Sequence, residues 1–281
     1  MSKSSGMIIG NLSKRASTFL NYQRPRVVFI HIPKTGGSSV HRSLKKVYGK
    51  ETYQIDPIST THAVNIVNGA NPSSADYNKF WLREALLLHE MAKGTQYISG
   101  HVHFKKDIWK AFHGQYFWVT VLRNPVKRYI SQYFFDAYKP GSHARVDEDI
   151  EEFITTDRGK IRGQLSVNYI GDFAGGDNID PTQKLEVAKE NLSRFATIGF
   201  LDDLDRFKLN LNQQLGLNVK FPYVNKNPVA KPEISSSVKR SIDEICKYDM
   251  LLYSYAKERF TSVGDDFSVA FSSHSSGSKL R

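Results

Sequence analysis

Two kinds of hydrophobic pattern alternate along the chain. Short runs of consecutive apolar residues predict buried strands at 26–32, 96–99, 116–122 and 196–200. Elsewhere apolar residues recur at every third or fourth position, which predicts helices at 38–48, 80–92, 125–138, 182–192, 204–215 and 238–260, with a short acidic helix within 147–157. Strands that alternate with helices indicate an α/β domain of three layers, with a central parallel sheet flanked by helices.

Serine-rich stretches and turn-forming residues predict the limits of this domain. We predict a flexible basic tail at 1–24, one domain at 25–262 and a disordered tail at 263–281. Within the domain, an Asp-Pro and an Asn-Pro pair predict turns, so the segment 51–76 is expected to be irregular.

The composition excludes several classes of protein. The chain has 281 residues, of which 40% are hydrophobic, so it can bury a core and is not a disordered protein over most of its length. No apolar run approaches the roughly 18 residues that a transmembrane helix needs. A single cysteine, Cys246, cannot form an internal disulfide, which excludes a disulfide-stapled extracellular domain.

The net charge of +11 indicates an anionic partner. Residues 1–50 hold ten Lys or Arg and no Asp or Glu, whereas residues 136–157 hold seven acids against two bases. Nucleic acid, a phosphate or sulfate ligand, an acidic polysaccharide and a membrane surface all fit this balance of charge.

The first candidate site is the glycine-rich sequence PKTGGSS (33–39), between a predicted strand and a predicted helix. Glycines let the backbone approach an anion, and the free N–H groups of the first helical turn point at it. Lys34 adds a positive charge, and the nearby hydroxyl groups add donors. In a nucleotide-hydrolysing P-loop the lysine follows the glycines. Here it precedes them, so the loop is P-loop-like and is not a standard ATP site.

A second candidate anion site begins at Arg123, which follows the predicted strand at 116–122. Ligands of open α/β sheets bind at the carboxyl ends of the strands, and a guanidinium grips a phosphate with two hydrogen bonds. Ser131 lies about two turns into the next helix and is expected to reach the same anion. Lys127 and Arg128 are expected to add positive field. Two anion sites at one sheet edge suit a ligand with two separated phosphate-like groups.

A third motif, SGHVHF (99–104), carries His101 and His103 after a predicted strand. Histidine titrates near neutral pH, so it is the side chain best suited to take a proton from a hydroxyl group. Gly100 is expected to permit a tight turn and a close approach of substrate. In an extended segment the two histidines point to the same side, so either is a candidate base.

The first two motifs together resemble a known family. HIPKTGGSS (31–39) and VTVLRNPVKRYISQY (119–133) are similar to the cofactor-binding signatures of sulfotransferases that use 3′-phosphoadenosine 5′-phosphosulfate (PAPS). The nearer branch is that of the Golgi-type carbohydrate sulfotransferases, with the heparan sulfate 2-O- and 6-O-sulfotransferases and their bacterial relatives. The likeness covers 26–260 and implies a P-loop-like α/β fold.

This resemblance implies a role for each motif. Arg123 and Ser131 hold the 3′-phosphate, and Lys34 neutralises charge as the phosphate leaves. His101 is the general base, by likeness to the 2-O-sulfotransferase branch, and His103 binds the acceptor or is itself the base. The residues that line the 5′ end of the donor are then Lys34, Thr35, Gly36, Gly37, Ser38 and Ser39.

No metal is expected, because His101 and His103 have no apparent third ligand in the sequence. Some branches of the family use a glutamate as base. The nearest upstream acids here, Glu84 and Glu90, fit a surface helix face better.

The resemblance implies a carbohydrate acceptor, and the basic chain suits an acidic one. No nucleic acid is expected as partner, while peripheral membrane contact and the oligomeric state stay open. A cytoplasmic enzyme of bacterial type is expected, or a Golgi enzyme if an anchor was removed.

The sequence leaves two alternatives to a sulfotransferase open. A P-loop-type nucleotide kinase is favoured by Asp202 and Asp203 after the strand at 196–200, where such enzymes hold Mg²⁺. A non-enzymatic polyanion-binding protein is favoured by the net charge alone.

Overall fold

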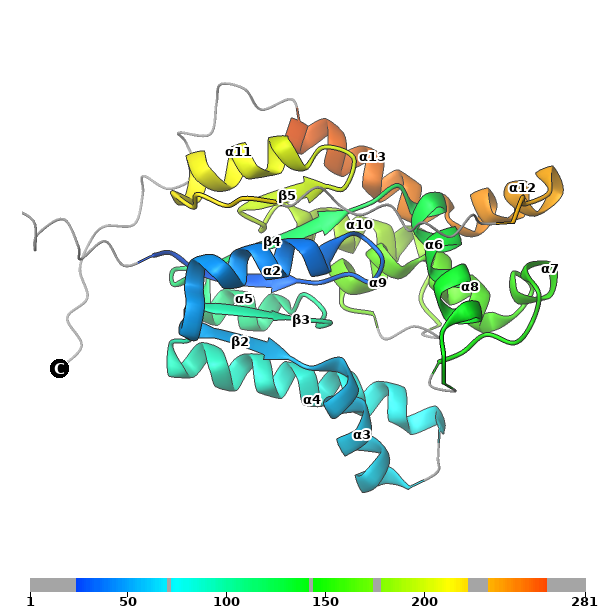
Figure 1. The fold of residues 1–281 in the computed structure, drawn as a ribbon, viewed down its shortest axis with the longest axis horizontal. Helices are drawn as coiled ribbons and strands as arrows, with labels where there is room; N and C mark the ends of the chain where they lie inside the picture. Colours follow the sequence, from blue (N-terminus) through cyan, green and yellow to red (C-terminus); the bar gives the residue numbers. More distant parts are fainter. Residues whose placement is uncertain (1–23, 70–71, 142–143, 174–177, 222–231, 262–281) are drawn as a thin grey trace, which may run out of the picture.

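The structure, a computed structural model, describes residues 24–69, 72–141, 144–173, 178–221 and 232–261. Five parallel strands form one sheet in the order β2-β3-β1-β4-β5 (Figure 1). Val28 at the centre of this sheet pairs with Ile98 on one side and Trp118 on the other. Because the strands are parallel, the residues that follow them gather at one edge of the sheet. The strands are β1 (Arg26–Ile30), β2 (Thr52–Ile55), β3 (Tyr97–Gly100), β4 (Tyr116–Leu122) and β5 (Thr197–Phe200).

Helices cover both faces of the sheet, because its strands are apolar on both sides. On one face, α2 (Gly37–Tyr48) and α11 (Leu204–Leu215) pack around Phe29 and Val119. The opposite face carries a larger core around Ile98, Trp118 and Ile198. In Figure 1, α2 lies in front of the sheet and α9 and α10 lie behind it. The helices of the second face are α4 (Pro72–Lys93), α5 (Lys106–Phe112), α9 (Leu165–Gly171), α10 (Pro181–Leu192) and α13 (Lys247–Thr261). The predicted three-layer α/β architecture is therefore confirmed.

A smaller group of helices lies beyond the carboxyl ends of the strands, on the right of Figure 1. Tyr133, Phe153 and Ile242 belong to its apolar core. At the same edge, α3 (Pro57–Asn68) follows β2 and packs on α4. The group consists of α6 (Pro125–Tyr138), α7 (Ile150–Phe153), α8 (Asp157–Gly163) and α12 (Ser236–Ile245).

Local sequence patterns predicted several elements with the same bounds that the structure has. The predicted strand at 116–122 and the predicted helices at 125–138 and 204–215 have the bounds of β4, α6 and α11. Asn124 caps α6 as expected, since its side-chain oxygen accepts from the amide of Lys127 at 3.0 Å.

The segment 51–76 was wrongly predicted to be irregular, because it holds β2, α3 and the start of α4. Its Asp-Pro pair begins a helix where a turn was expected. The Asp56 carboxylate accepts from the amides of Ile58 and Ser59, and Pro57 occupies the first helical turn. Both features are as favourable at a helix start as in a turn.

The long helix predicted over 238–260 is in fact two helices, α12 and α13, which meet at Cys246. Ile242 of α12 packs into the small core beyond the sheet, whereas Leu252 of α13 packs against the sheet. The break lets the two apolar faces point at different cores, which a single periodic pattern does not reveal.

The tails predicted at 1–24 and 263–281 lie outside the described residues, apart from Arg24. Every helix in the described ranges is too short or too polar to cross a lipid bilayer.

Candidate functional site

The glycine loop connects β1 to α2 through a backbone that an ordinary side chain would strain. Gly36 has a φ of 86° and Lys34 a φ of 65°, both in the left-handed region. A Cβ on Gly37 would lie 2.1 Å from Cδ2 of His31, and one on Gly36 would lie 2.4 Å from Cδ1 of Leu201. The loop therefore needs glycine at both positions, because neighbouring side chains fill the space.

The first turn of α2 is open to an anion. Its N-cap is Gly36, and no side chain accepts from its first amides. By contrast, a side chain caps each of the helices α3, α6, α10, α11 and α12. Uncapped amides at a helix start are the groups that can bind a phosphate or sulfate. The ammonium of Lys34 lies 3.8 Å from the centroid of the Phe135 ring on α6.

The hydroxyl groups of the loop are not equivalent. Thr35 is fully buried, and its hydroxyl donates to the carbonyl of Ile32 at 2.9 Å. Ser38 is exposed, and Ser39 is half-buried, with its amide donating to the carbonyl of Gly36 at 3.1 Å. The Thr35 hydroxyl thus holds the loop together, and the Ser38 hydroxyl faces solvent.

The first and second motifs meet in a direct contact. Nη1 of Arg123 donates to the carbonyl oxygen of Lys34 at 3.1 Å. Burial, and the charge of Arg128, lower the pKa of the Arg123 guanidinium from its ordinary value. Within the described ranges Arg123 forms no ion pair with a carboxylate. A half-buried cation beside another cation is a favourable place for a bound anion.

The two basic residues at the start of α6 differ in their surroundings. Arg128 is fully buried and donates to the side-chain oxygen of Gln132 at 2.8 Å and to the carbonyl of Arg162. It therefore takes part in the packing of α6 against α8, and its charge acts on Arg123 from inside the protein. Lys127 is exposed and Ser131 is half-buried.

His101 is held by the end of the neighbouring strand. Its Nδ1 lies 2.5 Å from the carbonyl oxygen of His31, and the two rings stack with centroids 4.5 Å apart. A carbonyl only accepts, so Nδ1 carries the proton and Nε2 keeps its lone pair. Burial and, to a smaller extent, the nearby charge of Arg83 lower the pKa of His101 to about 4, against the opposing effect of the hydrogen bond to His31. The imidazole is therefore neutral at physiological pH and has the tautomer of a base at Nε2.

His31 links His101 to the glycine loop. Its ring stacks on His101 and also fills the space above Gly37. Burial, with the charges of His101 and His41, lowers the pKa of His31 to about 3. Gly37 and His101 are 64 residues apart in sequence. In the structure the ring of His31 lies between them and contacts both.

His103 has different surroundings from His101. It is 3% exposed, stacks on Phe80 with centroids 4.0 Å apart and meets the edge of Tyr169. Burial, with the charge of Lys105, lowers its pKa to about 3. Gly100 does not form the expected tight turn. It is the last residue of β3, and a Cβ there would lie 2.8 Å from Cβ of Ile55 on the next strand.

A cluster of titratable groups surrounds His103, and the sequence did not reveal it. Glu84, His103 and Asp172 each bring a possible ligand atom within 4.8 Å of the others. The ammonium of Lys105 lies 2.9 Å from Asp172 and 3.2 Å from Glu84. A protein cation thus already bridges the two carboxylates where a metal ion would bind.

The two glutamates predicted on a surface helix face are both enclosed. Burial raises the pKa of Glu84, against the charge of Lys105. Glu90 is 4% exposed and is held by Lys93 at 2.8 Å and by Thr95 at 2.5 Å. Both face inward because long-range packing of α4 overrides what its polar pattern indicates.

The acids that favoured a kinase have structural partners. Asp202 accepts from the hydroxyl of Tyr253 at 3.1 Å and from Nζ of Lys257 at 2.8 Å. Asp203 caps α11 by accepting from the amide of Arg206. These contacts join the end of β5 to α13 and start α11, which accounts for both carboxylates without a bound Mg²⁺.

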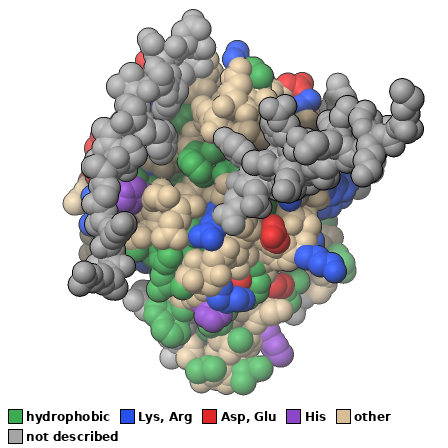
Figure 2. All heavy atoms as spheres, turned by 90° about the vertical axis from the view of Figure 1, so that its left-hand side faces the viewer, with side chains coloured by type: hydrophobic (Ala, Val, Ile, Leu, Met, Phe, Trp, Pro, Cys, Tyr) green, Lys and Arg blue, Asp and Glu red, His purple; other side chains and the backbone are tan. Residues whose placement is uncertain are grey.

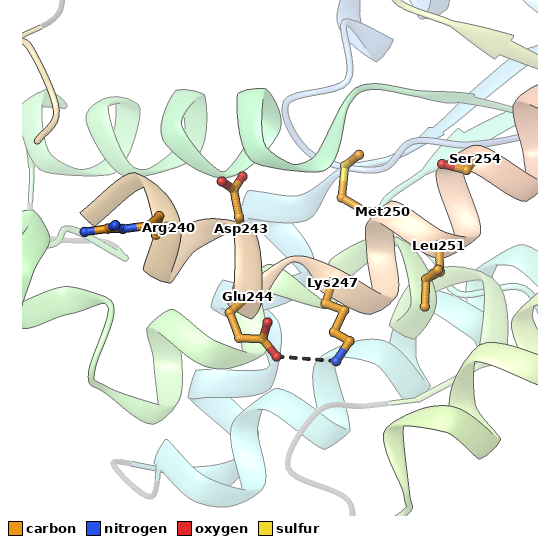
Figure 3. Close-up of a pocket in the computed structure, with 7 residues that line it drawn as sticks. All are labelled: Arg240, Asp243, Glu244, Lys247, Met250, Leu251 and Ser254. Atoms are coloured by element: carbon orange, nitrogen blue, oxygen red, sulfur yellow. Dashed lines mark ion pairs between the residues drawn. The ribbon is translucent and has the colours of Figure 1, made fainter. Parts of the chain in front are cut away.

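A surface hollow of ≈ 440 Å³ lies on α12 and α13 (Figure 3). It adjoins the second motif, since Sδ of Met250 is 3.8 Å from Nδ2 of Asn124. Its charges are mixed, with Glu244 paired to Lys247 at 3.6 Å. The hollow contains none of the loop residues or histidines described above, so the uncapped start of α2 lies elsewhere. It is lined by Arg240, Asp243, Glu244, Lys247, Met250, Leu251 and Ser254.

The face with the amino ends of the strands also mixes charges. Figure 2 shows basic and acidic side chains interspersed there, with hydrophobic side chains gathered at its lower end.

Known proteins resemble this chain in sequence. The model of the sulfotransferase family matches residues 17–159, just over half of the chain. A heparan-sulfate 6-O-sulfotransferase 2 from Gallus gallus is 22% identical over 271 residues, covering 83% of this chain and 66% of that protein. A heparan sulfate 2-O-sulfotransferase 1 from Xenopus laevis is 23% identical over 260 residues, covering 84% and 71%. The chain thus spans about two thirds of the length of these relatives.

Among solved structures, a sulfotransferase from Alicyclobacillus acidocaldarius is 15% identical, with a TM-score of 0.48. The alignment covers 85% of this chain and 96% of that one.

Proposed function

The chain belongs to the sulfotransferase family, and from this premise we propose that it moves the sulfuryl group of PAPS to a hydroxyl group of a carbohydrate. One observation carries the proposal above the others. The contact of Arg123 with the carbonyl of Lys34 brings two cation-bearing loops together at the carboxyl edge of the sheet. A donor with phosphates at both ends needs that arrangement.

The residues present fit such a donor. The uncapped start of α2, with Lys34, suits the 5′-phosphosulfate end, where Gly36, Gly37 and Ser38 would offer backbone amides. Arg123 and the half-buried Ser131 suit the 3′-phosphate. Bound there, the donor supplies an activated sulfuryl group. Thr35 and Ser39 support the loop, through the Thr35 hydroxyl and the Ser39 amide.

In this proposal His101 is the general base. Its Nε2 takes the proton of the acceptor hydroxyl while the acceptor oxygen forms a bond to sulfur. The bond between sulfur and the bridging phosphate oxygen breaks, and the electron pair leaves with that oxygen on 3′-phosphoadenosine 5′-phosphate. Lys34 neutralises the charge that develops there. The hydrogen bond from Nδ1 to the carbonyl of His31 keeps the tautomer that this step requires.

We propose a supporting role for His103 beside His101. Enclosed by Phe80 and Tyr169 and 3.8 Å from Asp172, it is suited to shaping the wall beside the base. The names of both relatives include heparan sulfate, which favours a carbohydrate acceptor for this chain. The positive net charge suits an acidic polysaccharide.

Calorimetric titration tests the donor first. The chain should bind 3′-phosphoadenosine 5′-phosphate without Mg²⁺, and AMP much more weakly, because only the former has the 3′-phosphate. Binding of ATP that depends on Mg²⁺, with no binding of 3′-phosphoadenosine 5′-phosphate, would promote the kinase. Incubation with PAPS labelled with sulfur-35 then compares acidic polysaccharides, neutral glycans and tyrosine peptides as acceptors.

A further inference from the structure

Arg83 of α4 joins three segments at the carboxyl edge of the sheet. The residue is 4% exposed. Its Nε donates to Oγ1 of Thr60 at 2.9 Å, and its Nη2 donates to the carbonyl of Pro57 at 3.0 Å. Its Nη1 donates to the carbonyl oxygen of His101 at 3.3 Å. One guanidinium thus connects the first turns of α3 to the peptide of His101.

His101 is held from both sides as a result. Its ring is fixed on β1 by the carbonyl of His31, and its backbone is fixed on α3 and α4 by Arg83. A guanidinium is planar and presents its donors in a rigid fork, so it sets the direction as well as the distance of each bond.

We propose that Arg83 is a positioning residue for His101, holding its peptide so that the imidazole stays against the carbonyl of His31 with Nε2 as acceptor. This inference rests on the proposed role of His101 as base. Arg83 does not touch the reacting atoms in this account. It acts through the residue that does.

The charge of Arg83 gives this role a measurable signature. Burial is the main cause that lowers the pKa of His101, and the positive charge of Arg83 adds to it. The other titratable group that faces His101 is His31, from the end of β1, which in turn faces His41 of α2. Removing the charge at position 83 should therefore raise the pKa of His101, whereas a lysine there should not.

The test compares Arg83→Lys and Arg83→Gln with the wild type, and Arg259→Lys on an exposed face as matched control. Arg83→Lys keeps the charge and loses the fork, so we expect kcat to fall on the order of 10²-fold with unchanged affinity for 3′-phosphoadenosine 5′-phosphate. In Arg83→Gln the acid limb of the kcat profile should also move to higher pH. Nitrogen-15 spectra of the imidazoles should show loss of the Nδ1–H tautomer of His101 in both variants.

A second pair of variants covers the case in which Arg83 variants do not fold. Thr60→Val removes the partner of Nε, and Thr60→Ser restores a hydroxyl. We expect Thr60→Val to lower kcat and Thr60→Ser to recover it. Wild-type kcat and tautomer in folded Arg83→Lys or Thr60→Val, or a wild-type acid limb in folded Arg83→Gln, would overturn the inference. If instead the wild type fails to bind 3′-phosphoadenosine 5′-phosphate, or His101→Ala keeps full activity, the proposed function itself fails.

Discussion

The ring of His31 occupies the space in which Gly37 would carry a side chain. A Cβ on Gly37 would lie 2.1 Å from Cδ2 and 2.5 Å from Nε2 of that ring. The same ring stacks on His101, with centroids 4.5 Å apart. The shape of the glycine loop and the position of His101 therefore depend on one another through His31.

Gly37→Ala should disturb the glycine loop and the position of His101 together. The added methyl must push the His31 ring away, and this moves the partner on which His101 stacks. We expect loss of binding of 3′-phosphoadenosine 5′-phosphate in calorimetry, together with a fall in kcat of about 10²-fold. Gly114→Ala is the matched control, since a Cβ there meets nothing within 4 Å. Normal binding of 3′-phosphoadenosine 5′-phosphate by Gly37→Ala would show that the His31 ring can move without altering the loop.

The two histidines should respond differently to substitution. His101→Asn keeps a donor toward the carbonyl of His31 but has no base, so kcat should fall by about 10²–10⁴-fold at an unchanged Tm. His103→Ala removes a side chain packed between Phe80 and Tyr169, so its first effect should be a lower Tm. Steady-state rates and thermal unfolding of both variants decide the matter. A larger fall in kcat for folded His103→Ala would make His103 the base.

Stability should decrease as pH falls below neutrality. Burial holds the pKa values of His31 and His103 at about 3 and that of His101 at about 4. The unfolded chain takes up protons below about pH 6.5, while the folded chain does not until the pH approaches these lower values. The stability that the neutral histidines contribute is thus complete above pH 6.5 and is lost as the pH falls from there to about 4 for His101 and about 3 for His31 and His103.

Denaturant titrations at several pH values measure this effect. Each histidine should contribute up to about 1.4 kcal/mol per pH unit to the slope of the unfolding free energy. His101→Asn should reduce the slope by the share of one histidine. A free energy of unfolding that stays flat from pH 7 to 5 would contradict the neutral state of these side chains.

Sequence reasoning succeeded where the signal is local. Asn124, Pro125 and the apolar run before them predicted the end of β4 and the start of α6, and the glycine-rich sequence predicted the loop between β1 and α2. It did not find the partner of His101, because His31 lies 70 residues away in sequence. It also missed the roles of Arg83 and Glu84, since a polar residue inside a helical pattern reads as solvated unless its tertiary partners are known.

Lys34→Ala should separate binding from turnover. The ammonium lies 3.8 Å from the centroid of the Phe135 ring, and the backbone of Lys34 belongs to the loop that precedes the uncapped start of α2. We expect kcat to fall about 10²-fold, because the charge acts on the departing phosphate more than on the bound donor. Lys45→Ala, on an exposed position of the same helix, should keep normal rates. Near-normal kcat in Lys34→Ala would remove that residue from the proposed chemistry.

Arg123→Ala should distinguish the two ends of the donor. The guanidinium is half-buried, donates to the carbonyl of Lys34 and makes no ion pair with a carboxylate in the described ranges. If it holds the 3′-phosphate, its loss should weaken binding of 3′-phosphoadenosine 5′-phosphate by roughly the 1.5–3 kcal/mol of a charged hydrogen bond. Binding of AMP, which lacks that phosphate, should hardly change. Ser131→Ala should also weaken binding of 3′-phosphoadenosine 5′-phosphate more than binding of AMP, but by a smaller free energy than Arg123→Ala. Equal losses for both ligands would mean that Arg123 supports the loop through Lys34 and does not read the 3′-phosphate.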